Sequence, residues 1–370
     1  MILGRNAPCH CGSGRKYKRC CLAKDEAGPS PEGGQRGADV RTADSRHSFD
    51  GAAPRVAFWA VAYLDILGYR QILKEMSSRI LELKEGEKID GPRIAAAAER
   101  SIKIRRELIG IMQTYKRAAE SIPARQVPGV PPEIQAMRAQ WSALRVRMAH
   151  FSDSIMLYMS LGEKREHDIA MPHLHTMLVG CCGAQLLQLA RGADDVRDTL
   201  PLRGAMDVDM GVEYPDRLDG AVEPTGEEKN HPELMQFYSA ALARAYEVEQ
   251  TEAVYPRVVV TEQFLKMLDT HANDESRLDL KGTVNRQYAE KSGGLLTQDG
   301  DGFWFVDFMG PGFRELSKDE RQRQPAEEAW KYVKAAYELH RSARNHALAR
   351  KYLWLRDYMR PRLSLWGVQE

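Results

Sequence analysis

Long apolar runs and an excess of charge of either sign are both absent from this sequence. No apolar stretch reaches the roughly 18 residues that a membrane-spanning helix needs, and charged residues and cysteines stand where a signal peptide would have an apolar core. The net charge of +1 argues against a dedicated nucleic-acid binder or a strongly basic membrane-surface protein. We therefore expect a cytoplasmic protein that has no membrane partner.

Cysteine is scarce, and its six residues fall into two groups. The adjacent pair Cys181 and Cys182 lies in an apolar stretch, where free cysteine is readily buried in a core. The other four form C-x-C-x8-C-C, and in a reducing compartment clustered cysteines are more often metal ligands than disulfides. We expect structural Zn2+, rather than a redox-labile tail, on four thiolates that can fill a tetrahedral shell: Cys9, Cys11, Cys20 and Cys21.

Residues 1–22, MILGRNAPCHCGSGRKYKRCCL, closely resemble the SEC-C motif. This small zinc module is found at the tail of the protein-export motor ATPase and in many other bacterial proteins. Its basic residues form either a solvated surface or a docking site for an acidic protein partner or RNA. Residues 25–54 are rich in Gly, Pro, Ala, Ser and charge, so a flexible linker is expected between a zinc module at 1–24 and a domain at 55–370.

A single carboxylate interrupts the most apolar part of the chain. The stretch FWAVAYLDILGY at 58–69 is typical of a buried strand, and its alternation places Tyr63, Asp65 and Leu67 on one face. Burying a lone carboxylate costs several kcal/mol unless a cation or hydrogen-bond donors meet it. A metal ion is the simplest such partner, and Gly68 then allows the backbone to turn closely around a phosphate or an ion.

A second acidic residue lies in a tight turn. Residues 146–151 and 155–159 are predicted to be strands, with Ser152, Asp153 and Ser154 between them. An Asp in such a turn is usually only a turn former. Together with a carboxylate that is buried in a strand, it becomes a candidate second metal ligand.

The remaining pattern predicts an α+β chain. An apolar helix is expected at 174–190, a strand at 202–214 with Asp207 and Asp209 on one face, a helix at about 233–254, a strand at 255–260 and a short helix after Thr261. The segment TQDGDG indicates a hairpin, and 326–358 one long or broken helix. The order predicts a ferredoxin-like βαββαβ core with a helical insertion at about 80–145, an amphipathic helix at 71–83, and C-terminal helices. His173 and His175 form H-x-H at a helix start, where a surface role is expected without a third ligand.

The segments DILGY at 65–69 and FSDS at 151–154 resemble the metal-binding pair of the class III nucleotide cyclase catalytic domain. That resemblance implies two Mg2+ or Mn2+ ions in each active site. Their ligands would be Asp65, Asp153 and the backbone of Ile66, with Gly68 and Tyr69 over the phosphates of a nucleoside triphosphate.

The same resemblance implies a head-to-tail homodimer with composite active sites. Arg203 and Arg257 are candidates for contacts with phosphate or with the transition state. The stretches at 202–214, 243–260 and 301–310 look more narrowly like bacterial anti-phage pyrimidine cyclases of the Pycsar type. They imply that UTP or CTP is converted to a 3′,5′-cyclic nucleotide as an alarm signal.

One departure from the family pattern keeps an alternative open. Purine cyclases carry an Asn and an Arg on the helix after the fourth strand, and this chain has Ala243 and Glu247 there. Charge in the transition state would then be stabilised from elsewhere, for example by Arg244 or Arg257. The alternative is a catalytically inactive cyclase-like homodimer that acts as an adaptor through its zinc module.

Overall fold

The computed structural model describes residues 54–69, 91–121, 132–133, 146–151, 154–162, 170–193, 196, 199–215, 235–316 and 323–370. The chain divides into two units, Met1–Ser48 and Phe49–Glu370, and all described residues lie in the second. The predictions for the zinc module, for most of the linker, for a helix at 71–83 and for Asp153 fall outside the described residues.

One mixed sheet forms the centre of the second unit. Its strands follow the order β2-β3-β1-β4-β6-β8-β7, and β5 pairs with β4 outside that path. Only the β4–β6 pairing is parallel among the described strands. The strands are β1 (Arg55–Ile66), β2 (Arg147–Phe151), β3 (Ser154–Gly162), β4 (Leu202–Pro215), β5 (Met235–Ser239), β6 (Val258–Val260), β7 (Leu296–Gln298) and β8 (Trp304–Val306).

The first four strands form two interlocked βαβ units. Because β1 and β2 are both antiparallel to β3, they run parallel to each other with β3 between them. In the same way β3 and β4 run parallel with β1 between them. The connecting segments contain the helices α3 (Gly91–Ser121) and α5 (Ala170–Arg191). This is the split βαββαβ arrangement, so the predicted α+β, ferredoxin-like core is confirmed.

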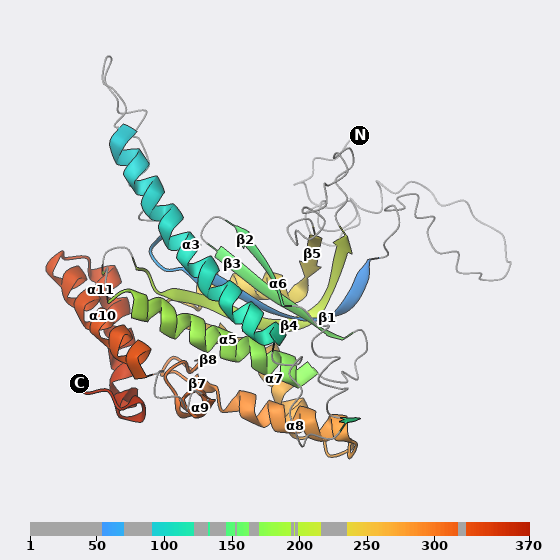
Figure 1. Ribbon diagram of the computed structural model, residues 1–370. Helices are drawn as coiled ribbons and strands as arrows, with labels where there is room; N and C mark the ends of the chain where they lie inside the picture. Colours follow the sequence, from blue (N-terminus) through green and yellow to red (C-terminus); the bar gives the residue numbers. More distant parts are fainter. Residues whose placement is uncertain are drawn as a thin grey trace, which may run out of the picture. The chain divides into compact units, whose positions relative to one another are not determined.

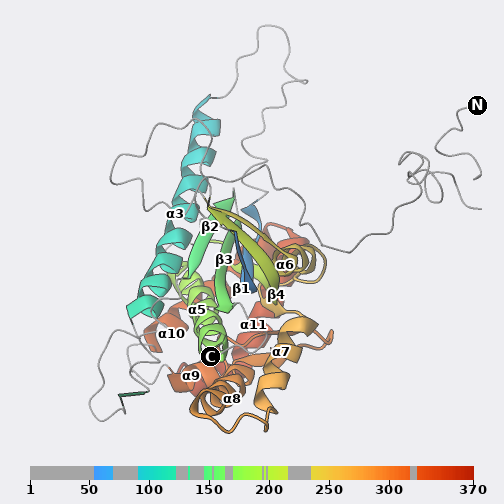
Figure 2. The same ribbon diagram turned by 90° about the vertical axis from the view of Figure 1, so that its right-hand side faces the viewer.

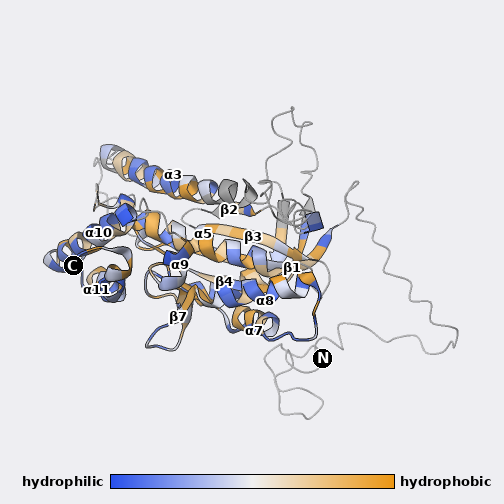
Figure 3. Cartoon of the chain, turned by 60° about the horizontal axis from the view of Figure 1, so that its bottom comes forward, coloured by the Kyte–Doolittle hydropathy of each residue, from blue (hydrophilic) through white to orange (hydrophobic). Residues whose placement is uncertain are grey.

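The two faces of the sheet have different coverings. Alternation along β1 turns Ala62 and Leu64 towards the layer of α3 and α5, and Trp59 and Val61 towards the face covered by α6 (Ala240–Thr251). Figures 1 and 2 show α3 and α5 on one side of β1 and β4, and α6 on the other. Figure 3 shows the central strands β1 and β3 as largely hydrophobic, which is typical of strands covered on both faces.

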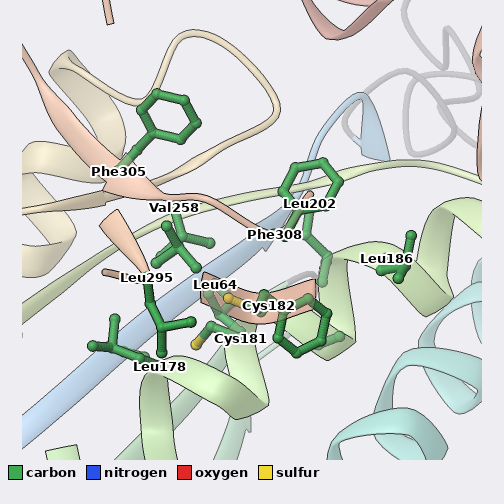
Figure 4. Close-up of a cluster of buried hydrophobic side chains, with 14 of the residues drawn as sticks. Leu64, Leu178, Cys181, Cys182, Leu186, Leu202, Val258, Leu295, Phe305 and Phe308 are labelled. Atoms are coloured by element: carbon green, nitrogen blue, oxygen red, sulfur yellow. The ribbon is translucent and has the colours of Figure 1, made fainter. Parts of the chain in front are cut away.

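The predicted cysteine packing is confirmed. Cys181 and Cys182 in α5 are fully buried and unpaired. Figure 4 shows both sulfurs among apolar side chains from the sheet and from α5, including Leu64 and Leu178. Burial raises the pKa of the Cys181 thiol to about 12. Both thiols are therefore packing groups in the core.

The long helix α3 belongs to the core layer. Its buried side chains join the main hydrophobic cluster and pack towards α5; they are Ile104, Leu108, Ile111 and Met112. A helical insertion is predicted at about 80–145. In the described part of that region, α3 lies between β1 and β2 in chain order.

The helix predicted for 233–254 begins later than expected. Residues 235–239 form β5, which pairs with the end of β4, and α6 starts only at Ala240. The hydroxyl of Ser239 caps α6 by accepting a hydrogen bond from the backbone N–H of Ala241. Tertiary pairing with β4 thus overrides a sequence that reads as helical.

The C-terminal segment is a broken pair of helices. Helix α10 (Arg323–Ser342) ends before Arg344, which has a positive φ of 56°, and α11 (His346–Met359) begins after its cap Asn345. Trp330 and Val333 are buried, whereas Tyr337 and Trp354 are only partly buried. The short helices α9 (Pro311–Leu316) and η6 (Arg360–Trp366) complete this end of the chain.

The prediction that His173 and His175 lie on the surface is wrong. Both side chains are buried in α5, which packs against α8 (Leu280–Gly293), and α7 (Glu262–Ala272) in turn packs on α8. His175 Nδ1 lies 3.2 Å from Ser292 Oγ. Neither ring nitrogen of His173 has a hydrogen-bond partner. Histidine is polar and was expected at the surface, but α8, more than a hundred positions away in the chain, packs over these side chains and buries them.

Among the described residues, the helices are too short or too polar for any of them to cross a membrane.

The buried histidines predict a loss of stability in mild acid. Burial lowers the pKa of His173 and of His175 from 6.5 to about 4, so the unfolded chain binds more protons in that range. Their contribution is complete above pH 6.5 and is lost as the pH falls towards 4, by roughly 3 kcal/mol for each histidine. Urea unfolding at a series of pH values measures this slope.

A matched pair of variants isolates one histidine. His173→Leu should remove one histidine's share of the slope and should be at least as stable as the parent at pH 7, because it removes two buried unpaired nitrogens. His346→Leu, at an exposed position, should leave the slope unchanged. An unchanged slope in His173→Leu would show that its imidazole titrates normally.

Candidate active site

Asp65 lies at the end of β1, inside the sheet. It is the penultimate residue of the strand and is 8% exposed. In the backbone register it faces Ser154 of β3 on one side and Arg203 of β4 on the other. The prediction of a buried carboxylate in this strand is confirmed.

Arg203 pairs with Asp65 and compensates its charge. Its Nε and Nη2 atoms donate to Asp65 Oδ2 at 3.0 and 2.9 Å. Because the two residues are direct neighbours across β1 and β4, the pairing is set by strand register. Arg203, predicted to contact phosphate, is thus engaged with the candidate metal ligand.

Glu249 of α6 is a third member of this site. Its Oε1 atom lies 2.6 Å from Arg203 Nη2, and its side chain has no solvent exposure. That oxygen has no partner with hydrogen-bond geometry, so the contact is an ion pair without a well-aligned hydrogen bond. Burial raises the pKa of Glu249, the positive charge of Arg203 opposes that rise, and the neighbouring Asp65 carboxyl adds to it.

Lys351 brings a second cation to the same place from α11. Burial lowers its pKa and Arg203 lowers it further, while Asp65 and Glu249 raise it. The site therefore gathers two basic and two acidic side chains. We name Asp65, Arg203, Glu249 and Lys351 the strand-end cluster.

Two tyrosines lie beside the strand-end cluster. The Tyr63 hydroxyl donates to Ser154 Oγ at 2.8 Å, and its ring meets Tyr246 of α6 edge-on, with centroids 5.4 Å apart. Burial raises the pKa of Tyr63. Tyr246 is half exposed, so one side of the site opens to solvent.

Asp153 itself lies outside the described residues, but its neighbour Ser154 locates the second motif. Ser154 is opposite Asp65 in β3 and also pairs with Phe151, the last residue of β2. Only residues 152 and 153 connect these two strands. The segments DILGY and FSDS therefore meet at one end of the sheet.

The turn after β1 has the expected glycine. Gly68 has a φ of 93°, a conformation that side chains with a Cβ rarely adopt. Tyr69 follows it and is buried, and its hydroxyl contacts that of Ser101 in α3. The Tyr69 ring packs in the core. The contact with the phosphates that the resemblance implies could therefore come only from the Tyr69 backbone.

Arg257 is held in a separate network. Its side chain is fully buried, and its guanidinium pairs with Asp299 and Asp301 in the loop between β7 and β8. Four aromatic rings surround it, with centroids 5.5 to 5.8 Å from its Cζ: Tyr255, Phe303, Phe305 and Trp354. This geometry ties the hairpin to α11 and leaves the Arg257 guanidinium without access to a phosphate.

A further ion-pair group lies on the α6 face of β4. Arg244 Nε is 2.7 Å from Asp207 Oδ2, and Arg244 Nη2 is 2.6 Å from Asp209 Oδ2, so the two aspartates share a face as predicted. Thr261 also donates to the buried Asp207, whose pKa is raised by burial.

A cavity of about 390 Å3 opens beside Arg244, between α6 and α7. Both signs of charge line it, since it includes Glu247 and Lys266 as well as Arg244. Arg244 is 39% exposed at its side chain and so faces this space. Of the arginines weighed from the sequence, it is the one that solvent can reach most readily.

No group of three or more potential metal-ligating side chains occurs among the described residues. Asp153 and the four N-terminal cysteines lie outside that part of the chain.

Comparison with known proteins gives a match at the N-terminus. Residues 5–23 match the SEC-C motif. A stretch of 24 residues is 75% identical to the protein translocase subunit SecA of Desulforudis audaxviator, and a stretch of 23 residues is 70% identical to SecA 1 of Rhodopirellula baltica. Each match covers 6% of this chain, and it spans only 3% and 2% of those relatives' lengths.

Comparison with solved structures finds cyclases at low similarity. The adenylyl cyclase CyaB from P. aeruginosa aligns with a TM-score of 0.34 and 9% identity, over 59% of this chain and 83% of that one. The guanylyl cyclase Cya2 aligns with a TM-score of 0.34 and 10% identity, over 58% and 80% of the two chains.

The environment of Arg257 predicts a structural role. Arg257→Ala should lower the free energy of unfolding by about 2 to 3 kcal/mol, since it leaves two carboxylates without their buried cation and removes an aromatic contact. Urea unfolding measures the loss, and Arg341→Ala, at an exposed surface pair, is the control. Full stability in Arg257→Ala would contradict the structural role and restore the residue as a ligand contact.

Proposed function

We propose that this chain is a nucleotide cyclase that converts a nucleoside triphosphate to a 3′,5′-cyclic nucleotide and pyrophosphate. The observation that carries the proposal is the register of Asp65 with Ser154, which brings the DILGY strand to the turn that contains Asp153. Asp65 lies at this strand end close to a glycine of positive φ, and Asp153 directly precedes Ser154 in the sequence. Two carboxylates brought together there would suit a metal-assisted phosphoryl transfer.

The residues fit a divalent cation. Carboxylate and backbone carbonyl oxygens are the donors that Mg2+ and Mn2+ prefer, and Asp65 already compensates the positive charge of Arg203. Asp65, Asp153 and the carbonyl of Ile66 would hold the ions. When bound, such ions lower the pKa of the ribose 3′-hydroxyl and neutralise the departing pyrophosphate.

The chain's own residues supply the rest of the chemistry. A bond forms between the 3′-oxygen and the α-phosphorus, the bond from that phosphorus to the pyrophosphate oxygen breaks, and the hydroxyl proton leaves to solvent. Gly68 gives the turn its close approach to the phosphates. Arg244, exposed beside the cavity, replaces Arg257 as our candidate for stabilising charge in the transition state.

The finer specificity comes from the sequence alone. The Pycsar-type stretches favour a pyrimidine triphosphate, UTP or CTP, and an anti-phage signal. A head-to-tail homodimer with composite sites completes this proposal. The N-terminal module would hold structural Zn2+ on its four cysteines, in keeping with the SEC-C match at 5–23.

Two features favour the inactive adaptor as the alternative. Ala243 and Glu247 stand where purine cyclases have Asn and Arg. In addition, the carboxylate of Asp65 is already ion-paired with Arg203. Pure protein incubated with each of the four nucleoside triphosphates and Mn2+ distinguishes the two functions. No cyclic product from any of the four, together with zinc-dependent capture of a partner, would establish the adaptor.

Substitution of either acidic residue tests the site. Asp65→Asn and Asp153→Asn should each lower the rate of cyclic nucleotide formation by roughly 10²- to 10³-fold or more, because charge that develops at the phosphates loses its metal. Both variants should still fold, as monitored by circular dichroism. Asp269→Asn, on the exposed side of α7, is the matched control. Wild-type turnover in Asp65→Asn would refute the metal site.

The N-terminal module and the cyclase domain should be energetically independent, because a Gly- and Pro-rich linker transmits no strain. Deletion of residues 1–50 should leave cyclase activity intact and abolish partner capture through Arg15, Lys16, Lys18 and Arg19. Chelation or Cys9→Ser should unfold the module alone, as measured by proteolysis and zinc content. A truncated protein that is folded but inactive would show that the module takes part in catalysis.

A further inference from the structure

Arg203 is shared between two carboxylates in the strand-end cluster. Its Nη2 atom lies 2.9 Å from Asp65 Oδ2 and 2.6 Å from Glu249 Oε1. Its Nη1 atom also donates to the backbone carbonyl of Ala253 at 3.4 Å. One guanidinium therefore links the end of β1 to α6 and to the residues that follow it.

A metal ion at Asp65 would take away one of these partners. The backbone of Arg203 is fixed opposite Asp65 by the β1–β4 register, and its side chain is only 16% exposed. The guanidinium therefore has little room to reach water when Asp65 turns to another cation. A buried cation that is left without a counter-charge is strongly unfavourable, so the site needs a second acceptor for Arg203.

Glu249 has the properties of that acceptor. Its side chain is fully buried, and it lies beside Arg203 before any exchange has taken place. Its Oε1 atom makes no hydrogen bond, although it is within 2.6 Å of the guanidinium. A small rotation of Arg203 would turn this ion pair into a hydrogen-bonded one. A buried carboxylate oxygen with unused acceptor capacity has no advantage for stability alone.

We propose that Glu249 is a positioning residue that receives the Arg203 guanidinium when Asp65 binds a divalent cation. Metal binding then replaces the Arg203–Asp65 ion pair with an Arg203–Glu249 ion pair, and no buried charge is left without a partner. The inference rests on the proposed function, since it takes Asp65 as a metal ligand. It assigns a role to a residue of α6 that is not among the predicted metal ligands.

Mn2+ binding to the nucleotide-free, zinc-loaded full chain tests the proposal, measured by isothermal titration calorimetry. Binding at the proposed site is the part of the Mn2+ binding that is present in the wild type and absent in Asp65→Asn. Glu249→Gln should weaken that binding by roughly 10- to 100-fold, as loss of a partner outside the ligand shell does. Glu290→Gln, on the exposed surface of α8, should leave it unchanged.

A double-variant comparison separates this role from a purely structural one. When Arg203→Gln removes the displaced cation, Glu249→Gln should have no further effect on Mn2+ affinity. Equal weakening by Glu249→Gln with and without Arg203 would overturn the proposal, because Glu249 would then act through the fold or on the metal. If Glu249→Gln fails to fold, Glu249→Asp, which draws the carboxylate back from Arg203, should weaken Mn2+ binding in the same Arg203-dependent way.

The remaining outcomes separate this inference from the proposed function. Normal Mn2+ affinity in Glu249→Gln, with loss of binding in Asp65→Asn, would overturn the role of Glu249 and leave the metal site standing. Equal Mn2+ binding by wild type and Asp65→Asn would overturn both.

Discussion

The charge of Asp65 is the constraint around which this end of the molecule is built. A carboxylate inside a sheet needs a counter-charge within reach, and Arg203 provides it from the neighbouring strand. Arg203 in turn contacts Glu249, so α6 is held against the strand end. Lys351 adds the influence of α11. One buried charge thus connects β1 with β4 and, through Arg203, with α6.

The part of this arrangement that depends on local pattern could be predicted. Alternation along 58–69 placed Asp65 on a buried face, and the glycine after the strand indicated a sharp turn; both hold, with Gly68 at a φ of 93°. The partner of Asp65 could not be predicted in the same way. Arg203 is 138 positions away, and only the β1–β4 register brings the two residues together. Sequence pattern carries no strand register, so from the sequence a metal ion is the simplest counter-charge for Asp65.

Glu249 was missed for a related reason. In ARAYEVEQTE it is one of several acidic residues on an amphipathic helix, and the sequence does not reveal which of them points into the protein. In the structure Glu247 is exposed and Glu249 is fully buried. For the same reason, the sequence did not reveal that Arg257, His173 and His175 are buried. Their residue types suggested ligand contact or surface, whereas Asp299, Asp301 and α8 reach them from distant parts of the chain.

The two faces of the sheet differ in the charge of the side chains that they carry. Towards α3 and α5 the buried side chains of β1 and β4 are apolar, among them Leu64, Met206 and Val208. Towards α6 the same strands carry three aspartates, each paired with an arginine: Asp65, Asp207 and Asp209. Buried ion pairs seldom stabilise a fold more than apolar side chains of similar size. Part of the surface beneath α6 is apolar, with Trp59 and Val61 packed there, so packing alone would favour apolar residues at the three aspartate positions as well. All three ion pairs lie on this face, with Asp65 at the strand end that faces Ser154 and with Asp207 and Asp209 further along β4, opposite Val61 and Trp59. Such a gathering of ionisable groups is more typical of a functional surface than of a packing surface.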